Sequence, residues 1–382
     1  MSIVLWVGPY LSMSGYGGVS RNYVTALSRR DIPIVIVNAG PDQRTQLSQR
    51  EIDLFECSSD LSKLAGEDVH LVINQLPNMA EQLLDHLLSV SNRLGIRIQS
   101  SSIVTIFETE SIPRGWLASL LRFDRVVVPT EFNRKTFSFA GVPITNLVVI
   151  PYCIDTEFLV PAEIPRDDSI NISYVFDFSH RKGVDLLLEA YGLLREISDA
   201  IVLTLKTPAF TGSSGSWLLS FVEDTVRRRF GSAGLAEYPR LRIDIGSIHV
   251  DRLRDLYWST DLYVSTDRAS GWGMPALEAM ACGVPVSAIE YSGGSEFVSE
   301  ENGYPIKTTG KIVSVDGRLV DEIPIYEGHS WGEVSTSAVV DALTTAILDP
   351  FRSHKAALAR KTAENYSFGA IGELFASSVL EA

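Results

Sequence analysis

The stretch SGWGMPALEAMACGVPVSA, residues 270–288, combines a glycine-bracketed turn with a helix pattern that opens on a proline and contains one glutamate. Gly271 and Gly273 lack the side chains that would keep a ligand away from the backbone amides. Pro275 suits the first turn of a helix, whose unpaired amides would favour a phosphate. Glu278, among apolar neighbours, needs donors such as ribose hydroxyls. The stretch predicts an anion and sugar pocket, although an ordinary capped helix on a sheet has the same pattern.

The residues before this stretch indicate where the pocket lies. Leu253, Leu256 and Tyr257 have the spacing of an amphipathic helix, and residues 262–264 have the pattern of a short buried strand. That strand would deliver the glycine turn at its carboxyl end, where open parallel sheets bind ligands. This context favours the pocket over the capped helix.

In its order of residues, the stretch resembles the signature of the retaining glycosyltransferases of family 4, which have the two-domain GT-B fold. The matching residues are Ser270, Gly271, Trp272, Gly273, Met274, Pro275, Glu278, Gly283, Pro285 and Val286. The resemblance implies that the turn from Gly271 through Trp272 and Gly273 to Met274 serves the donor sugar and phosphates. It also implies that Glu278 binds the ribose of a nucleotide sugar.

One position departs from the family pattern. The family has two glutamates eight positions apart, and Ser270 stands where the first, associated with the donor sugar, is expected. A serine can exchange one hydrogen bond there but brings no charge. Either the donor sugar differs, or a neighbour such as Asp267 substitutes, or catalysis is weakened.

Further stretches resemble the family in the same order along most of the chain. Gly15, Gly17 and Gly18 predict a flexible turn before a helix beginning near Val19, and the resemblance places Gly17 and Gly18 against the donor phosphates. Thr130 is expected to cap the helix that follows the last strand of the amino-terminal domain.

The stretch YVFDFSHRKGVDLLLEAYGLL, residues 174–194, resembles the first strand and helix of the family's carboxyl-terminal domain. The resemblance implies a phosphate cluster of Arg181, Lys182 and Lys206. A fixed cation would stabilise the charge that develops on a leaving diphosphate. The alternative for each is a solvated charge at the end of a strand or helix.

Two other sites carry weaker signals. Glu108 and Glu110 follow a predicted strand and could bind an acceptor hydroxyl or take its proton, although surface carboxylates are common there. By resemblance His249 would lie near the nucleotide base, and the alternative is an exposed loop histidine.

Composition excludes several classes of partner. A net charge of −14 argues against nucleic acid. Three cysteines and six histidines show no metal-ligand spacing, so we expect no metal and no cofactor beyond the nucleotide-sugar substrate. No apolar run approaches the roughly 20 residues that cross a membrane, and the start of the chain has no positively charged flank or cleavage site, which predicts a cytoplasmic protein.

Residues 114–135 form the one basic and apolar patch, which could touch the inner face of a membrane or a lipid-linked acceptor. The same residues suit a helix that packs on the core and extends its arginines to solvent. The residues concerned are Arg114, Trp116, Leu117, Leu120, Leu121, Arg122, Arg125, Arg134 and Lys135.

Alternation of strand and helix patterns predicts an α/β protein. With the resemblance, this implies a GT-B fold of two Rossmann-like domains whose parallel sheets face a central cleft. The expected limits are 1–152, joined by a helix at about 367–382, and 153–366. Strands are predicted at 3–8, 33–38, 70–74, 103–107, 125–129, 147–150, 172–176, 201–206, 241–245, 262–264 and 284–288. Residues 308–331 break the rhythm and predict a loop or small β insertion.

The function that the resemblance implies is transfer of a hexose, with retention and without a metal, from a UDP- or GDP-linked donor. The acceptor would be a hydroxyl of a saccharide or lipid-linked molecule, in polysaccharide or glycoconjugate biosynthesis. Two alternatives stay open: a nucleotide-sugar-binding protein without turnover, motivated by Ser270, and a phosphorylase or epimerase of the same fold.

Overall fold

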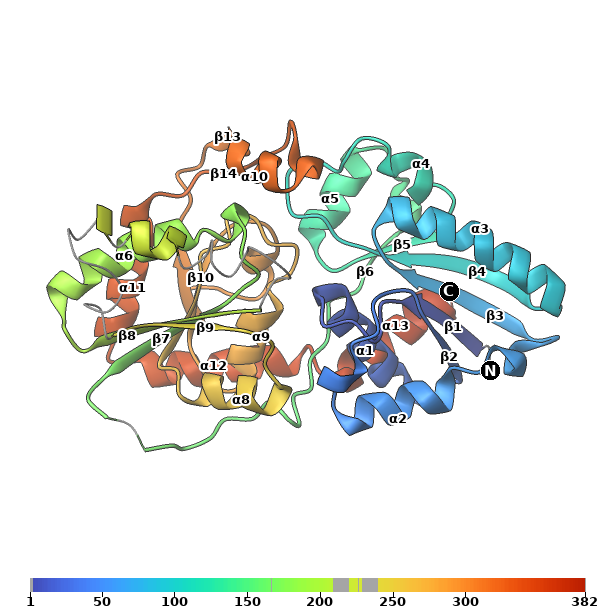
Figure 1. The fold of residues 1–382 in the computed structure, drawn as a ribbon, viewed down its shortest axis with the longest axis horizontal. Helices are drawn as coiled ribbons and strands as arrows, with labels where there is room; N and C mark the ends of the chain where they lie inside the picture. The colour runs from blue at the N-terminus through green and yellow to red at the C-terminus, as the bar shows by residue number, and fades with distance from the viewer. Residues whose placement is uncertain (1–2, 166, 209–219, 226, 229–239, 382) are drawn as a thin grey trace. The chain divides into compact units, whose positions relative to one another are not determined.

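The computed structural model of the protein describes residues 3–165, 167–208, 220–225, 227–228 and 240–381. The chain divides into two compact units, one made of residues 1–156 with 365–382 and the other of residues 157–364. Each unit contains a six-stranded parallel sheet with helices (Figure 1), so the predicted α/β class is confirmed. The expected domain limits, at residues 152 and 366, stay predictions.

The sheet of the first unit has the strand order β2-β1-β3-β4-β5-β6. Its strands are β1 Ile3–Gly8, β2 Ile34–Asn38, β3 Asp68–Asn74, β4 Arg97–Val104, β5 Arg125–Val128 and β6 Leu147–Val149. Its helices are α1 Gly15–Ser28, α2 Gln49–Ser58, α3 Pro77–Leu94, α4 Trp116–Leu120, α5 Glu131–Phe139 and α13 Phe368–Phe375. The predicted cap is confirmed, because the Thr130 hydroxyl accepts the amide of Asn133 at 2.9 Å.

The last helix of the chain belongs to this first core. The ring of Phe375 on α13 lies 6.1 Å from Trp6 and 5.2 Å from Tyr23, between centroids. A Cβ on Gly372 would lie 2.8 Å from the carbonyl oxygen of Ala26, so this glycine lets α13 approach the backbone of α1. Buried aromatic area is a large hydrophobic contribution, which explains why the carboxyl-terminal segment folds with residues far from it in sequence.

The sheet of the second unit has the order β12-β11-β10-β7-β8-β9. Its strands are β7 Ile170–Val175, β8 Ile201–Thr207, β9 Leu241–Ile245, β10 Leu262–Ser265, β11 Val286–Ile289 and β12 Gly303–Ile306. Its helices include α6 Val184–Ile197, α8 Val250–Trp258, α9 Met274–Ala281, α11 Thr336–Leu348 and α12 Arg352–Glu364. α6 packs with α11, and α9 packs with α12.

The segment that broke the strand and helix rhythm is a small β insertion, as predicted. β13 Ile312–Ser314 pairs antiparallel with β14 Ser330–Gly332, and α10 Gly317–Glu322 lies between them. Figure 1 shows these three elements close together, and in the chain they follow the edge strand β12. The strand pattern did not predict β12, because its sequence GYPI contains a glycine and a proline, which are tolerated in an edge strand.

Candidate functional site

Two loops at the carboxyl edge of the second sheet are joined by close backbone contacts. They follow β7 and β10, which are neighbours in the sheet. The amide of Arg268 donates to the carbonyl of Arg181 at 2.8 Å, and the Thr266 hydroxyl donates to the carbonyl of Lys182 at 3.2 Å. Gly183 has φ +62°, and a Cβ there would lie 2.1 Å from the carbonyl oxygen of Thr266. Glycine is therefore required for the two loops to meet.

These loops surround a buried ion pair. The Lys182 ammonium lies 2.8 Å from Oδ2 of Asp267, and the Tyr174 hydroxyl donates to Oδ1. The Arg181 guanidinium donates to the carbonyl of Ala269 at 2.8 Å. Burial alone would raise the pKa of Asp267, but the charges of Lys182 and Arg181 and the two hydrogen bonds outweigh it and lower that pKa. Asp267 is thus a carboxylate that orients the ammonium.

Lys206, the third predicted phosphate ligand, has partners of its own. Its ammonium lies 3.0 Å from Oδ1 of Asp244 and donates to the carbonyl of Gly246 at 2.9 Å. Lys206 and Asp244 are register partners on β8 and β9, so their side chains share one sheet face. The structure therefore joins Arg181 and Lys182 around Asp267 and pairs Lys206 with the end of β9. The phosphate role of all three stays a prediction.

The glycine turn is held by the segment that follows β11. The amide of Ser270 donates to the Ser292 hydroxyl at 2.9 Å, and the amide of Gly293 donates to the carbonyl of Ser270 at 2.7 Å. A Cβ on Gly293 would lie 2.3 Å from the carbonyl oxygen of Gly271. Gly273 has φ +94° and precedes α9. Three successive strand ends, those of β7, β10 and β11, thus converge on this turn.

The side chains of the turn differ in what they can offer a ligand. Trp272 is 3% exposed and its ring lies 5.2 Å from Phe297, between centroids, so it is a packing residue. Ser270 is also buried, beside a cavity of about 10 Å³ that Asp267 lines as well. Met274 begins α9 and is half-buried. Contact between this turn and a ligand would therefore depend mainly on backbone groups.

Glu278 lies one turn into α9 and pairs with a tyrosine that the sequence did not assign to the site. The Tyr257 hydroxyl on α8 donates to Oε2 of Glu278 at 2.7 Å. Burial raises the pKa of Glu278 to about 7, and the hydrogen bond from Tyr257 opposes that rise. A fully buried tyrosine on the inner face of α8 was the available signal, because such a hydroxyl needs a partner.

The raised pKa gives stability a pH dependence. The folded protein binds a proton at Glu278 more tightly than the unfolded chain does, so the free energy of unfolding falls as pH rises from about 4.5 to about 7. We expect Glu278→Gln, which removes this penalty, to be more stable than the wild type at pH 8 by up to about 3 kcal/mol. The difference should shrink near pH 4.5. Urea unfolding of both proteins at the two pH values checks this, and a pH-independent difference would contradict it.

The structure places His249 at a helix end. Its ring accepts the amide of Asp251 at 3.5 Å as the cap of α8, and Nδ1 lies 2.9 Å from Oδ2 of Asp251. Tyr257, the partner of Glu278, is eight residues further along α8, which is about 12 Å of helix. The described contacts do not join His249 to the other predicted donor ligands, and its assignment to the nucleotide base stays a prediction.

The first unit contains the other predicted residues. The predicted turn at Gly17 and Gly18 is wrong, because α1 already begins at Gly15 with Ser14 as its cap. A Cβ on Gly17 would lie 2.0 Å from the carbonyl oxygen of Ser12, which explains the glycine within a helix. The Ser14 hydroxyl accepts the Gly17 amide at 3.2 Å. This cap lets the helix begin at Gly15, where the glycines suggested a loop.

Glu108 lies after β4 beside two residues that sequence reasoning missed. The hydroxyls of Tyr16 and Thr105 are 3.3 Å apart. Burial raises the pKa of Tyr16, and the charge of Glu108 adds to that rise while the contact with Thr105 opposes it. Glu108 is half-buried and Glu110 is exposed. These side chains come from α1 and from the segment after β4, and the role of Glu108 toward an acceptor stays a prediction.

The patch at residues 114–135 is mainly a packing surface. Trp116 and Leu120 are buried, whereas Leu121 is 52% exposed. Arg122 forms ion pairs with Glu81 and Asp85 on α3. The packing of Trp116 and Leu120 agrees with the second of the two expectations for this stretch. Contact of the patch with a membrane or a lipid-linked acceptor stays a prediction.

The described residues contain no group of three or more histidine, cysteine, aspartate or glutamate side chains placed to hold a metal ion. No helix in the described part of the chain has the length and apolar character needed to cross a bilayer.

Part of the chain is similar in sequence to known glycosyltransferases. The family model described as glycosyl transferases group 1 matches residues 170–314. A lipopolysaccharide core biosynthesis mannosyltransferase of Rhizobium meliloti is 31% identical over 53% of this chain and 56% of its own length. A GDP-mannose-dependent phosphatidylinositol monomannoside mannosyltransferase of Mycobacterium tuberculosis is 26% identical over 52% of this chain and 50% of its own length. The chain thus spans about half the length of these curated relatives.

Two solved structures share the fold over the whole chain. The HepE protein of Anabaena, in complex with UDP and glucose, has a TM-score of 0.67 at 15% identity and covers 99% of both chains. A UDP-forming trehalose-phosphate synthase of Burkholderia xenovorans has a TM-score of 0.68 at 12% identity and covers 100% of both. At these identities the likeness shows the fold alone. The family match, residues 170–314, spans the loops after β7 and β10 and the helix with Glu278, and over this stretch the chain matches the glycosyl transferases group 1 family model.

Proposed function

We propose that the chain transfers a hexose from a UDP- or GDP-linked sugar to a hydroxyl of a saccharide or lipid-linked acceptor, with retention at the anomeric carbon. The observation that carries the proposal is the convergence of Arg181, Lys182 and the glycine turn at one sheet edge, with Glu278 in the helix that the turn opens. The names of the relatives, two of them mannosyltransferases, support the sugar class. The fold neighbour with UDP and glucose supports a nucleotide-sugar donor.

In this proposal the residues bind and orient, and the substrates carry the bond changes. The bond from the anomeric carbon to the diphosphate breaks, and the acceptor oxygen bonds to that carbon on the same face. The acceptor proton passes to the leaving phosphate. Lys182 and Arg181 stabilise the diphosphate charge in place of a metal ion, and Glu278 accepts hydrogen bonds from ribose hydroxyls.

A second candidate is a protein that binds a nucleotide sugar without turnover. Ser270 supports it, because this side chain is uncharged where the family has a glutamate. Asp267, the nearby carboxylate that could substitute, is held by Lys182 and Tyr174. We favour the transferase because the phosphate oxygens of a bound donor would replace the Asp267 carboxylate as the partner of Lys182. That carboxylate would then be available to the hydroxyls of the donor sugar.

Calorimetric titration with UDP-, GDP- and ADP-linked hexoses tests both candidates. We expect saturable binding of one donor by the wild type, loss of that binding in Glu278→Ala, and no loss in Glu301→Ala, an exposed glutamate of the same unit. Incubation of the bound donor with saccharide acceptors then separates the candidates. Product formation supports transfer, binding without product supports the second candidate, and failure of every donor to bind contradicts both.

A further inference from the structure

A second pocket is lined by residues that flank Arg181 and Lys182 in the sequence. It has a volume of about 410 Å³, within the range of small-molecule sites. Its lining residues are Phe178, Ser179, His180, Val184, Asp185, Phe221, Arg228, Arg318, Asp321 and Glu322. None of them lines the small cavity beside Ser270. The last three lie on α10, so the insertion forms one wall of this pocket.

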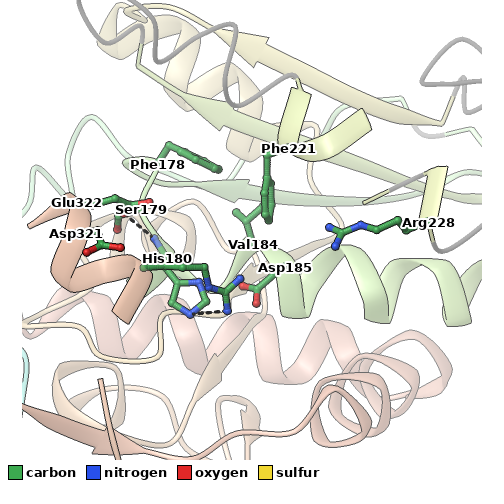
Figure 2. A pocket seen from close by; sticks show the side chains of 10 residues that line it. Phe178, Ser179, His180, Val184, Asp185, Phe221, Arg228, Asp321 and Glu322 are labelled. Atoms are coloured by element: carbon green, nitrogen blue, oxygen red, sulfur yellow. Dashed lines mark hydrogen bonds between the residues drawn. The ribbon is translucent and has the colours of Figure 1, made fainter. Parts of the chain in front are cut away.

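The pocket combines aromatic faces with hydrogen-bonding groups. Phe178 and Phe221 have centroids 5.7 Å apart in an edge-to-face arrangement. Figure 2 shows these rings along one side of the pocket, with Asp321 and Glu322 at one end and Arg228 extending toward it from the other. A ligand with an apolar face and polar groups around its edge would match this arrangement.

Most charges of the lining are already neutralised within the protein. Asp185 forms a two-point ion pair with Arg268, at 2.7 and 2.8 Å. Arg318 pairs with Asp316 at 3.0 Å. Burial, with the charge of Arg268 as the next cause, lowers the pKa of His180 to about 4, so its ring is neutral at physiological pH. Arg228 donates to the carbonyl of Asp224 at 3.2 Å and to the Thr225 hydroxyl at 3.4 Å, and one carboxylate oxygen of Glu322 accepts the His180 amide. The Asp321 carboxylate and the other oxygen of Glu322 can accept hydrogen bonds from the hydroxyl groups of a neutral ligand.

We propose that this pocket binds a neutral saccharide unit, at a subsite distinct from the one that holds the donor. The C–H face of the sugar ring packs on Phe178 and Phe221, and its hydroxyls donate to Asp321 and Glu322. The proposal rests on the proposed function in one respect, which is that the bound saccharide is part of an acceptor or of a product chain. Binding itself does not require turnover.

The pocket also contacts the donor loop directly. Oε2 of Glu322 accepts the backbone amide of His180 at 3.3 Å, and His180 is followed by Arg181 and Lys182. A saccharide that engages Glu322 therefore touches the segment that positions the Lys182 ammonium. This contact predicts that donor and saccharide affinities depend on each other.

The test is saturation-transfer NMR with methyl glycosides of glucose, galactose, mannose and N-acetylglucosamine, on the full chain without donor. We expect one glycoside to bind the wild type and its affinity to fall about tenfold in Phe221→Ala and in the isosteric Asp321→Asn. The matched controls are Phe351→Ala and Asp341→Asn, which change exposed side chains elsewhere in the same unit.

Each outcome decides the proposal. Loss in both pocket variants, with retention in both controls, supports it. Binding that survives both pocket variants places the sugar elsewhere and overturns the proposal, as does the absence of binding by all four glycosides. Titration of the same variants with the donor is a separate measurement that tests the proposed function. Donor binding without glycoside binding leaves the proposed function standing and removes only the saccharide pocket.

Discussion

Lys182→Ala should lower kcat for hexosyl transfer by about 100- to 1000-fold, the range seen when one preorganised group that stabilises developing charge is removed. In the structure the Lys182 side chain is 16% exposed and its ammonium is held by Asp267, so it is positioned before a donor arrives. The same change leaves the Asp267 carboxylate buried without its ion-pair partner. Breaking a buried pair in this way costs about 3–5 kcal/mol, so stability should fall together with activity. Steady-state kinetics and urea unfolding measure the two effects.

A double variant separates them. Lys182→Ala combined with Asp267→Asn removes both charges, and we expect it to regain most of the lost stability while kcat stays low. Lys361→Ala, an exposed lysine on α12, should leave kcat and stability unchanged. Recovery of kcat in the double variant would show that Lys182 serves only to neutralise Asp267, and its role toward the diphosphate would be wrong.

Gly183→Ala should disrupt the donor loop through both its backbone conformation and the space available. A left-handed residue with a Cβ costs about 1–2 kcal/mol. In addition, the new carbon would lie 2.1 Å from the backbone oxygen of Thr266, so the loops after β7 and β10 must separate. We expect a lower free energy of unfolding and loss of donor binding, measured by urea unfolding and calorimetry.

The control for this prediction is Gly310→Ala. Gly310 has φ +78°, close to the value at Gly183, but no atom lies within 4 Å of the position of its Cβ. It should therefore show the backbone cost alone and keep donor binding. The difference between the two variants, expected to exceed about 2 kcal/mol, measures the close approach of the loops. Equal effects would mean that the two loops do not need to touch.

The sequence by itself determined most strands and the order of the loops. Leu262–Ser265 is buried along its length, and such continuous apolar runs are typical of parallel sheets. Where polar residues enter a strand, the pattern failed: β4 begins at Arg97 rather than near residue 103, and its polar first half pairs with β3 from Asp68 onward. The start of α1 was also missed, because the cap from the Ser14 side chain allows a helix to begin at Gly15 in spite of three glycines in its first turn.

The site shows the same division. Sequence order and family resemblance predicted Lys182, Ser270 and Glu278 as site residues, because loops at the carboxyl ends of parallel strands meet at one edge. Only the tertiary structure decided which side chains act on them. Tyr257 reaches Glu278, and Asp267 holds Lys182, through contacts between residues 21 and 85 positions apart. Local patterns determine strands and helices, whereas pairing of buried polar groups depends on which segments the fold brings together.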